Sequence, residues 1–185
     1  MKKFLKWFVI SVLVLAAIGY GYYRYSLYQT KKLSPEVEVE YEKNGFKAEV
    51  FYNSPSMRGR EIFGDLVPYG EVWRTGANEP TTLKINKSVM INGQELPEGK
   101  YTIWTIPGRS TWDVIFNDKM YRWGITYDGT ASREPQYDAL TVTVPIDKIS
   151  RSIERFTIEL EEGKTSPLEM RLIWDHTLIV IPMVY

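Results

Sequence analysis

Apolar and polar residues alternate over residues 37–43 and 46–52, and the dipeptide Asn44-Gly45 separates the two stretches. Alternation with a period of two is typical of strands that bury one face, and Asn-Gly favours a two-residue hairpin turn. The pattern therefore predicts a β-hairpin. A second Asn-Gly, at residues 92 and 93, lies between two short apolar stretches and predicts another hairpin.

Short apolar stretches separated by turn residues continue along the chain, at the spacing found in sandwiches and barrels. The expected strands are residues 83–86, 89–91, 95–96, 101–106, 112–116, 140–144, 156–160, 168–174 and 178–184. A short turn of helix is expected at residues 147–152, and Asp175 with His176 is expected to form a turn between the last two strands. We predict an all-β domain with an antiparallel β-sandwich or jelly-roll-like fold.

The N-terminal pattern is different, because residues 7–23 carry no charge and follow Lys2, Lys3 and Lys6. These 17 residues are at the lower end of the roughly 17 to 25 that a membrane-spanning helix needs. A secretory signal peptide with small residues at Ala17 and Gly19 is the alternative. The tyrosines that follow are typical of an interfacial belt and favour an uncleaved anchor.

We therefore expect an N-terminal membrane anchor (or signal sequence) with its tether at residues 1–31, the tether continuing to Pro35, and a single β-domain at residues 32–185. Residues 7–23 would contact the membrane. A short basic N-terminus normally stays in the cytoplasm, which predicts an inner-membrane anchor with the domain in the periplasm or otherwise outside the cytoplasm.

Composition narrows the possible functions. The chain has no cysteine, which excludes disulfides, thiolate catalysis and iron–sulfur ligation. Residues 32–185 hold 18 Lys and Arg against 23 Asp and Glu, and no basic stripe is present for binding nucleic acid. With one histidine and no phosphate-binding glycine loop, we expect no cofactor and no metal.

The segment at residues 58–82 combines three arginines, four carboxylates, a tryptophan and four glycines, and is too irregular for one helix or strand. Two interpretations remain open. The arginines can pair with the nearby acids and clamp the loop, or the loop can form a polar pocket for a small polar ligand or an envelope partner. The candidate binding residues are Arg58, Arg60, Trp73, Arg74, Asn78, Glu79, Trp104 and Trp123. Residues 121–128, which combine aromatic residues with a cation, are a candidate rim of the same site.

Enzymatic activity stays open, although the sequence favours binding without chemistry. A hydrolase that uses two of the carboxylates Glu61, Asp65, Glu71 and Glu79 is the alternative, and a structural assembly module is the third possibility. His176 is expected to be a surface turn residue and not a catalytic base, because no Gly-x-Ser-x-Gly motif accompanies it.

A series of short motifs extends from the arginine-rich segment toward the C-terminus. The motifs are Gly59-Arg60, Ile62-Phe63-Gly64, Leu66-Val67-Pro68-Tyr69-Gly70, residues 72–79, Ile91-Asn92-Gly93, Leu96-Pro97, Gly99, Tyr101, Ile106-Pro107-Gly108 and Trp112. Together they resemble the signature of an uncharacterised bacterial family, catalogued as domain of unknown function 2911, over most of residues 45–185. The resemblance implies an exported or membrane-anchored envelope protein, and it implies no known activity, substrate or catalytic residue.

Overall fold

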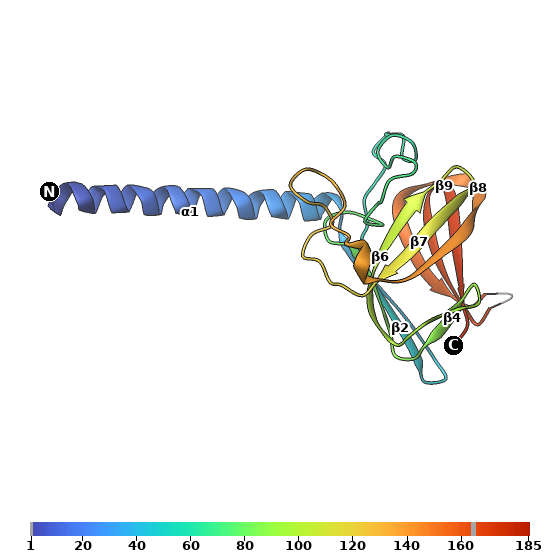
Figure 1. Ribbon diagram of the computed structural model, residues 1–185. Helices are drawn as coiled ribbons and strands as arrows, with labels where there is room; N and C mark the ends of the chain where they lie inside the picture. The colour runs from blue at the N-terminus through green and yellow to red at the C-terminus, as the bar shows by residue number, and fades with distance from the viewer. Residues whose placement is uncertain (1, 164–165) are drawn as a thin grey trace. The chain divides into compact units, whose positions relative to one another are not determined.

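A computed structural model describes residues 2–163 and 166–185. The chain divides into two units, one ending at Leu33 and the other beginning at Ser34. The elements are α1 (Lys2–Leu33), β1 (Glu36–Lys43), β2 (Phe46–Asn53), β3 (Thr81–Ile85), β4 (Val89–Ile91), β5 (Gln94–Leu96), β6 (Gly99–Pro107), β7 (Thr111–Asn117), the 3-10 helix η1 (Pro135–Tyr137), β8 (Asp138–Glu161) and β9 (Leu168–Met183) (Figure 1).

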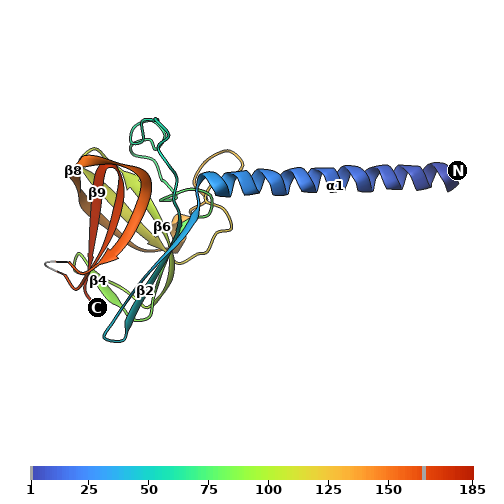
Figure 2. The ribbon, with the colours of Figure 1, turned by 180° about the vertical axis from the view of Figure 1, so that it is seen from behind.

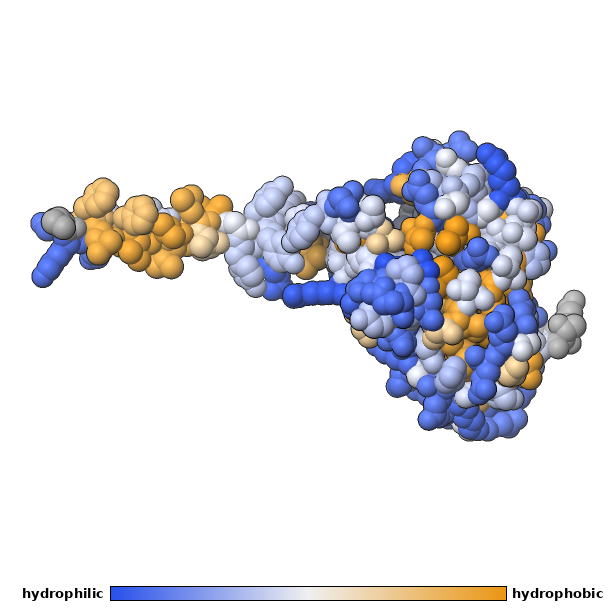
Figure 3. All heavy atoms as spheres, in the orientation of Figure 1, coloured by the Kyte–Doolittle hydropathy of each residue, from blue (hydrophilic) through white to orange (hydrophobic). Residues whose placement is uncertain are grey.

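The first unit is one helix of 32 residues, roughly 48 Å long at 1.5 Å per residue. Apolar side chains cover the half of the helix nearer its N-terminus, and more polar side chains follow (Figure 3). By length and composition α1 can cross a membrane. The helix α1 includes the first residues of the expected tether, because it continues to Leu33. The helix ends there because Pro35 disfavours a helical backbone at Ser34.

The second unit is built on a seven-stranded antiparallel sheet in the order β1-β2-β3-β6-β7-β8-β9. The two predicted Asn-Gly hairpins are confirmed, as β1–β2 and as the separate pair β4–β5. In both turns Asn and Gly have positive φ angles, 52° and 74° at Asn44-Gly45 and 48° and 77° at Asn92-Gly93. This backbone matches a type I′ turn, whose twist fits the flanking strands.

The sheet curls until distant strands meet. Residues 55–57, which follow β2, pair with β8. The Met57 amide donates to the Glu154 carbonyl at 2.8 Å, and the Phe156 amide donates to the Pro55 carbonyl at 2.9 Å. At another point Met90 of β4 exchanges two backbone hydrogen bonds with Val184. Figures 1 and 2 show the sheet curling so that β9 faces β6 and β7 across the interior, while the first part of β8 pairs with β7. The predicted all-β antiparallel fold after an N-terminal helix is confirmed, with one curled sheet supplying the facing layers.

Two details of the predicted strands were wrong. Residues 140–144 and 156–160 belong to one strand, β8, with no helical turn at residues 147–152, and β9 runs through Asp175 and His176 without a hairpin turn. The pairing jumps from Lys148 opposite Thr177 to Ile153 opposite Asp175, and Asp175 has a φ angle of 50°. The polar residues that suggested turns therefore form a β-bulge, in which extra residues on one strand face fewer on the other.

An aromatic cluster fills one part of the interior. The rings of Trp73 and Trp174 lie nearly parallel with centroids 5.8 Å apart, and Phe156 contacts Trp73 at 5.1 Å. The rings of Trp112 and Phe63, whose centroids are 5.0 Å apart, complete the cluster. Trp112 and Trp174 were expected in the core, and both are buried. Such tilted and offset contacts contribute about 0.5–1.5 kcal/mol per pair beyond the area they bury.

Elsewhere in the interior, Tyr185 stacks on Phe46 with ring centroids 4.0 Å apart. Its hydroxyl lies 3.0 Å from the hydroxyl of Tyr41 on β1. Burial, together with this hydrogen bond, raises the pKa of Tyr41 to about 12. The contact joins the first hairpin to the segment that follows β9.

We expect Phe156→Ala to lower the free energy of unfolding by about 3–5 kcal/mol, because it opens a cavity inside the aromatic cluster. Urea denaturation of the full-length protein in detergent, followed by tryptophan fluorescence, measures this change. Tyr127→Ala is the matched control, since Tyr127 is fully exposed and its loss is expected to change stability by about 0.5 kcal/mol or less. A cost for Phe156→Ala no larger than that of the control would contradict the role assigned to the cluster.

Candidate functional site

The loop between β2 and β3 returns to the sheet before β3 begins. The Trp73 amide donates to the Thr105 carbonyl at 2.7 Å and the Thr105 amide donates back to the Trp73 carbonyl at 3.0 Å. The Gly70 amide bonds to the Pro107 carbonyl at 2.8 Å, so residues 70–73 lie along β6 beyond the end of β3. Because neighbouring side chains on a strand point to opposite faces, Trp73 enters the interior and Arg74 lies on the outer face.

A strained turn follows Arg74. Thr75 is fully buried and has a φ angle of 54°, which is unusual for a β-branched residue, and Gly76 follows with a φ angle of 145°. The Thr75 hydroxyl bonds to that of Thr105 at 3.2 Å, and the Thr81 hydroxyl donates to the Thr75 carbonyl. A Cβ atom at Gly76 would lie 2.9 Å from the Asn53 carbonyl oxygen, so this position requires glycine.

Buried amides tie this turn to its surroundings. The Asn78 side-chain nitrogen, Nδ2, donates to Asn53 Oδ1 at 3.2 Å, and Asn53 Nδ2 donates to Glu79 Oε2 at 3.1 Å. The Asn78 carbonyl accepts the Gly124 amide at 2.8 Å, which brings in the loop between β7 and η1. Asn78 and Glu79, two of the predicted binding residues, therefore hold the two loops in place.

Arg74 lies directly beneath this second loop. A Cβ atom added to Gly124 would fall 2.2 Å from Arg74 Cδ, so only glycine leaves room for the arginine side chain. Arg74 is half-buried, and its Nε is the one buried side-chain nitrogen or oxygen without a hydrogen-bond partner among residues 2–163 and 166–185. Burial lowers the pKa of the Arg74 guanidinium, and no charge in the described part of the chain contributes to the shift.

Arg74 lines a cavity of about 130 Å³ between the two loops. Glu71 is its other charged lining residue, and the apolar walls are formed by Leu66, Val67, Pro68, Val72, Ile125 and Ala131. A second cavity of about 320 Å³ shares Glu71, Val72, Gly129 and Ala131 with the first and extends to Arg133. The arrangement is a cation without an ion-pair partner in a small hollow that also contains a carboxylate and several aliphatic side chains.

The remaining two arginines of the loop do not line either cavity. Arg60 donates to the carbonyls of Met57 at 2.9 Å and Ser56 at 2.8 Å. Arg58 is exposed, and its amide bonds to a Glu154 carboxylate oxygen at 3.0 Å. Among the ion pairs of the described residues, none joins Arg58, Arg60 or Arg74 to Glu61, Asp65 or Glu71. Arg60 therefore stabilises the loop through carbonyl groups and not through the ion pairs considered in the clamp interpretation.

The three candidate tryptophans lie in different places. Trp73 belongs to the aromatic cluster and is 8% exposed, with its Nε1 donating to the Gly76 carbonyl at 3.1 Å. Trp104 is fully buried, donates to the Thr102 hydroxyl at 3.0 Å and contacts the ring of Tyr121 edge-on. Trp123 is half-exposed. Of the three, Trp73 is the one that lines the cavity with Arg74.

The acids considered for hydrolysis are spread out. Glu61 and Asp65 are exposed on the loop, and Glu79 accepts the hydrogen bond from Asn53, so Glu71 is the one that lines the cavity. His176 is exposed, with its Nδ1 3.0 Å from the Ile149 carbonyl oxygen. It lies on β9 and is not among the residues that line the cavity.

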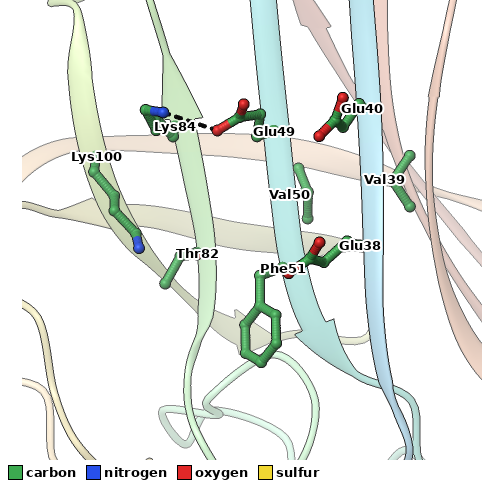
Figure 4. Close-up of a pocket in the computed structure, with 9 residues that line it drawn as sticks. All are labelled: Glu38, Val39, Glu40, Glu49, Val50, Phe51, Thr82, Lys84 and Lys100. Atoms are coloured by element: carbon green, nitrogen blue, oxygen red, sulfur yellow. Dashed lines mark hydrogen bonds and ion pairs between the residues drawn. The ribbon is translucent and has the colours of Figure 1, made fainter.

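A further hollow lies on the outer face of β1, β2, β3 and β6, where glutamates of β1 and β2 lie beside lysines of β3 and β6 (Figure 4). Glu49 is at its centre, 2.5 Å from the Lys47 ammonium and 3.0 Å from that of Lys84. The hydrogen bonds from Lys47 and Lys84 lower the pKa of Glu49 to about 2. Glu49, Lys47 and Lys84 are therefore already paired, whereas no ion pair is formed by Arg74 in the described part of the chain.

Sequence reasoning missed several lining residues of the cavity. Leu66, Val67 and Pro68 carried no chemical signal beyond their place in the arginine-rich segment. Ile125 lies within residues 121–128, the stretch proposed as a rim, and the structure places it in the same cavity as Arg74. The requirement for glycine at residue 124 depends on a contact with Arg74, which is distant in sequence and left no local pattern.

The fold and this loop site define an all-β domain of one curled antiparallel sheet, preceded by a helix long and apolar enough to span a membrane. The chain belongs to the family described as protein of unknown function (DUF2911), whose family model matches residues 34–183. The resemblance seen in the sequence motifs is thereby confirmed. No curated protein and no solved structure matches the chain.

We expect Arg74→Met to raise the free energy of unfolding of the ligand-free protein by about 1 kcal/mol, since an apolar side chain of similar length avoids burying an unpaired charge. That gain corresponds to about 2–4 °C in the melting temperature of a domain of this size. Thermal melting of the full-length protein in detergent checks it, with Arg58→Met as the control for loss of an exposed guanidinium. Early melting of Arg74→Met would instead support a purely structural role for this arginine.

Proposed function

We propose that the protein is a membrane-anchored binding module whose β-domain takes up a small anionic ligand at Arg74. The observation that carries the proposal is the partly buried guanidinium of Arg74, which lines a cavity and whose buried Nε has no hydrogen-bond partner among the described residues. Native structures leave few buried polar atoms unpaired, and those that remain need an explanation. An anion that accepts hydrogen bonds from Arg74 would provide the missing partner, and its charge would offset the cost of desolvating the cation.

The surroundings of Arg74 support binding by a pre-formed site. The strained Thr75 backbone and the Asn53–Asn78 hydrogen bond fix the turn that follows Arg74, and Gly124 packs on the arginine side chain. Strain of this kind persists where the surrounding structure enforces it, and it is concentrated at functional sites. A rigid site loses little conformational entropy when its ligand binds.

Binding is expected to raise the melting temperature. At a ligand concentration 100 times the dissociation constant the free energy gained is about 2.7 kcal/mol, which corresponds to about 5–10 °C here. The full-length protein in detergent is melted with acetate, butyrate, succinate, phosphate or sulfate, each against sodium chloride at equal ionic strength. At least one anion should raise the melting temperature of the wild type and of Arg58→Met but not of Arg74→Met. A rise that persists in Arg74→Met would place the site elsewhere.

We also propose that α1 stays attached as the anchor and that the β-domain lies outside the cytoplasm. The proposal is supported by the lysines at residues 2, 3 and 6, since short basic segments are retained in the cytoplasm. It is further supported by the tyrosines of α1, of the type found at membrane interfaces. A cleaved signal sequence would give a domain outside the cytoplasm without an anchor.

The absence of cysteine from the sequence allows a direct test of this topology. Tyr127→Cys, at a fully exposed position, should react with a membrane-impermeant maleimide in intact spheroplasts of the bacterial host. Lys3→Cys should react only after lysis. Labelling of Lys3→Cys in intact spheroplasts would contradict the orientation, and loss of residue 3 from the mature protein, detected by intact mass, would show that the segment is cleaved.

A further inference from the structure

We propose that the anion bound at Arg74 is a monocarboxylate with a short aliphatic body. This inference rests on the proposed function of the site and narrows it to one class of ligand. The argument has three parts: the number of charges that the site can neutralise, the chemistry of its walls and the size of the hollow.

The site offers one positive charge. Arg133 lines the adjoining cavity, but its Nε donates to Asp138 Oδ1 at 3.0 Å and its Nη2 pairs with the other carboxylate oxygen. Both of these side chains are mostly buried, at 13% and 17% exposed, so this pair is already neutral. Arg74 therefore remains as the cation available to a ligand in this part of the described structure.

Glu71 adds a negative charge to the same wall. It is exposed and lines both cavities, so it lies where a ligand bound to Arg74 would extend. A dianion such as phosphate or succinate would keep one charge uncompensated in a partly desolvated hollow and next to this carboxylate. Like charges at close range raise the free energy of the complex, which disfavours dianions relative to monoanions.

Besides the two charged residues, aliphatic side chains line the cavity, with Leu66, Val67 and Pro68 from one loop and Ile125 and Ala131 from the other. A purely inorganic anion would leave these apolar surfaces without contacts. A hydrocarbon body attached to the carboxylate would bury them, with a gain of about fourfold in affinity for each methylene that fits. The planar guanidinium also matches a planar carboxylate through two parallel hydrogen bonds.

The hollow limits the length of that body. Its volume of about 130 Å³ is close to that of engineered cavities, about 150 Å³, that accept a molecule of the size of benzene. A carboxylate with two to four further carbons fills this space, and longer chains must extend toward the adjoining cavity near Glu71. The expected ligands are therefore acids of the size of butyrate or isovalerate, whether free or at the end of a larger molecule.

The test is isothermal titration calorimetry of the full-length protein in detergent with acetate, propionate, butyrate, isovalerate, butyramide, succinate and phosphate at constant ionic strength. These short compounds partition weakly into micelles. Affinity should rise about fourfold per methylene from acetate to butyrate. Butyramide, the neutral analogue of butyrate, should bind at least tenfold more weakly than butyrate. Succinate and phosphate should bind at least tenfold more weakly than butyrate.

Two variants separate the possible outcomes. Arg74→Met should abolish butyrate binding, whereas Arg58→Met should bind butyrate with the affinity of the wild type. Glu71→Gln should increase the affinity for succinate and phosphate relative to that for butyrate, because it removes the negative charge that repels a dianion. If phosphate or succinate binds more tightly than butyrate and needs Arg74, the inference about the ligand class is wrong and the anion-binding function stands. If no anion binds in a manner that depends on Arg74, both are wrong.

Discussion

The site depends on the pairing of Trp73 with Thr105. Two backbone hydrogen bonds fix this part of the loop as an extra length of strand beside β6, and the tryptophan ring is held among Phe156, Trp112 and Trp174. Once Trp73 is committed to the interior, the alternation of side chains places Arg74 outside, beneath the neighbouring loop. The free energy gained from aromatic burial offsets the unfavourable desolvation of the cation, so the core and the site are not independent.

The polar network around the turn serves a second purpose. Asn53, Asn78 and Gly124 connect the end of β2, the turn before β3 and the loop after β7, three segments far apart in sequence. Each buried amide would be costly if left unpaired, so the three segments are stable only in a shared arrangement. The cavity walls consequently come from two loops that cannot shift separately without breaking buried hydrogen bonds.

Much of the fold could be predicted, because local patterns determine it. The Asn-Gly hairpins and the strands up to β7 follow from alternation and turn residues, and the family motifs were legible in the same way. Bulges were missed in β8 and β9, since residues 149–152 and Asp175 have the composition of turns but lie within continuous strands. For the site, the sequence indicated the loop and Arg74. It could not show that Arg60 bonds to carbonyls, or that Gly124 packs on Arg74, because these contacts depend on tertiary structure.

The contact between the first hairpin and the segment after β9 has a consequence for the order of folding. Tyr41 and Tyr185 are 144 residues apart, and Phe46 is stacked on Tyr185. During synthesis, Tyr41 and Phe46 of the β1–β2 hairpin therefore lack their contacts with Tyr185 until that residue has left the ribosome. Contacts of such long range form slowly, so the closure of this part of the core is expected to be a late step in folding.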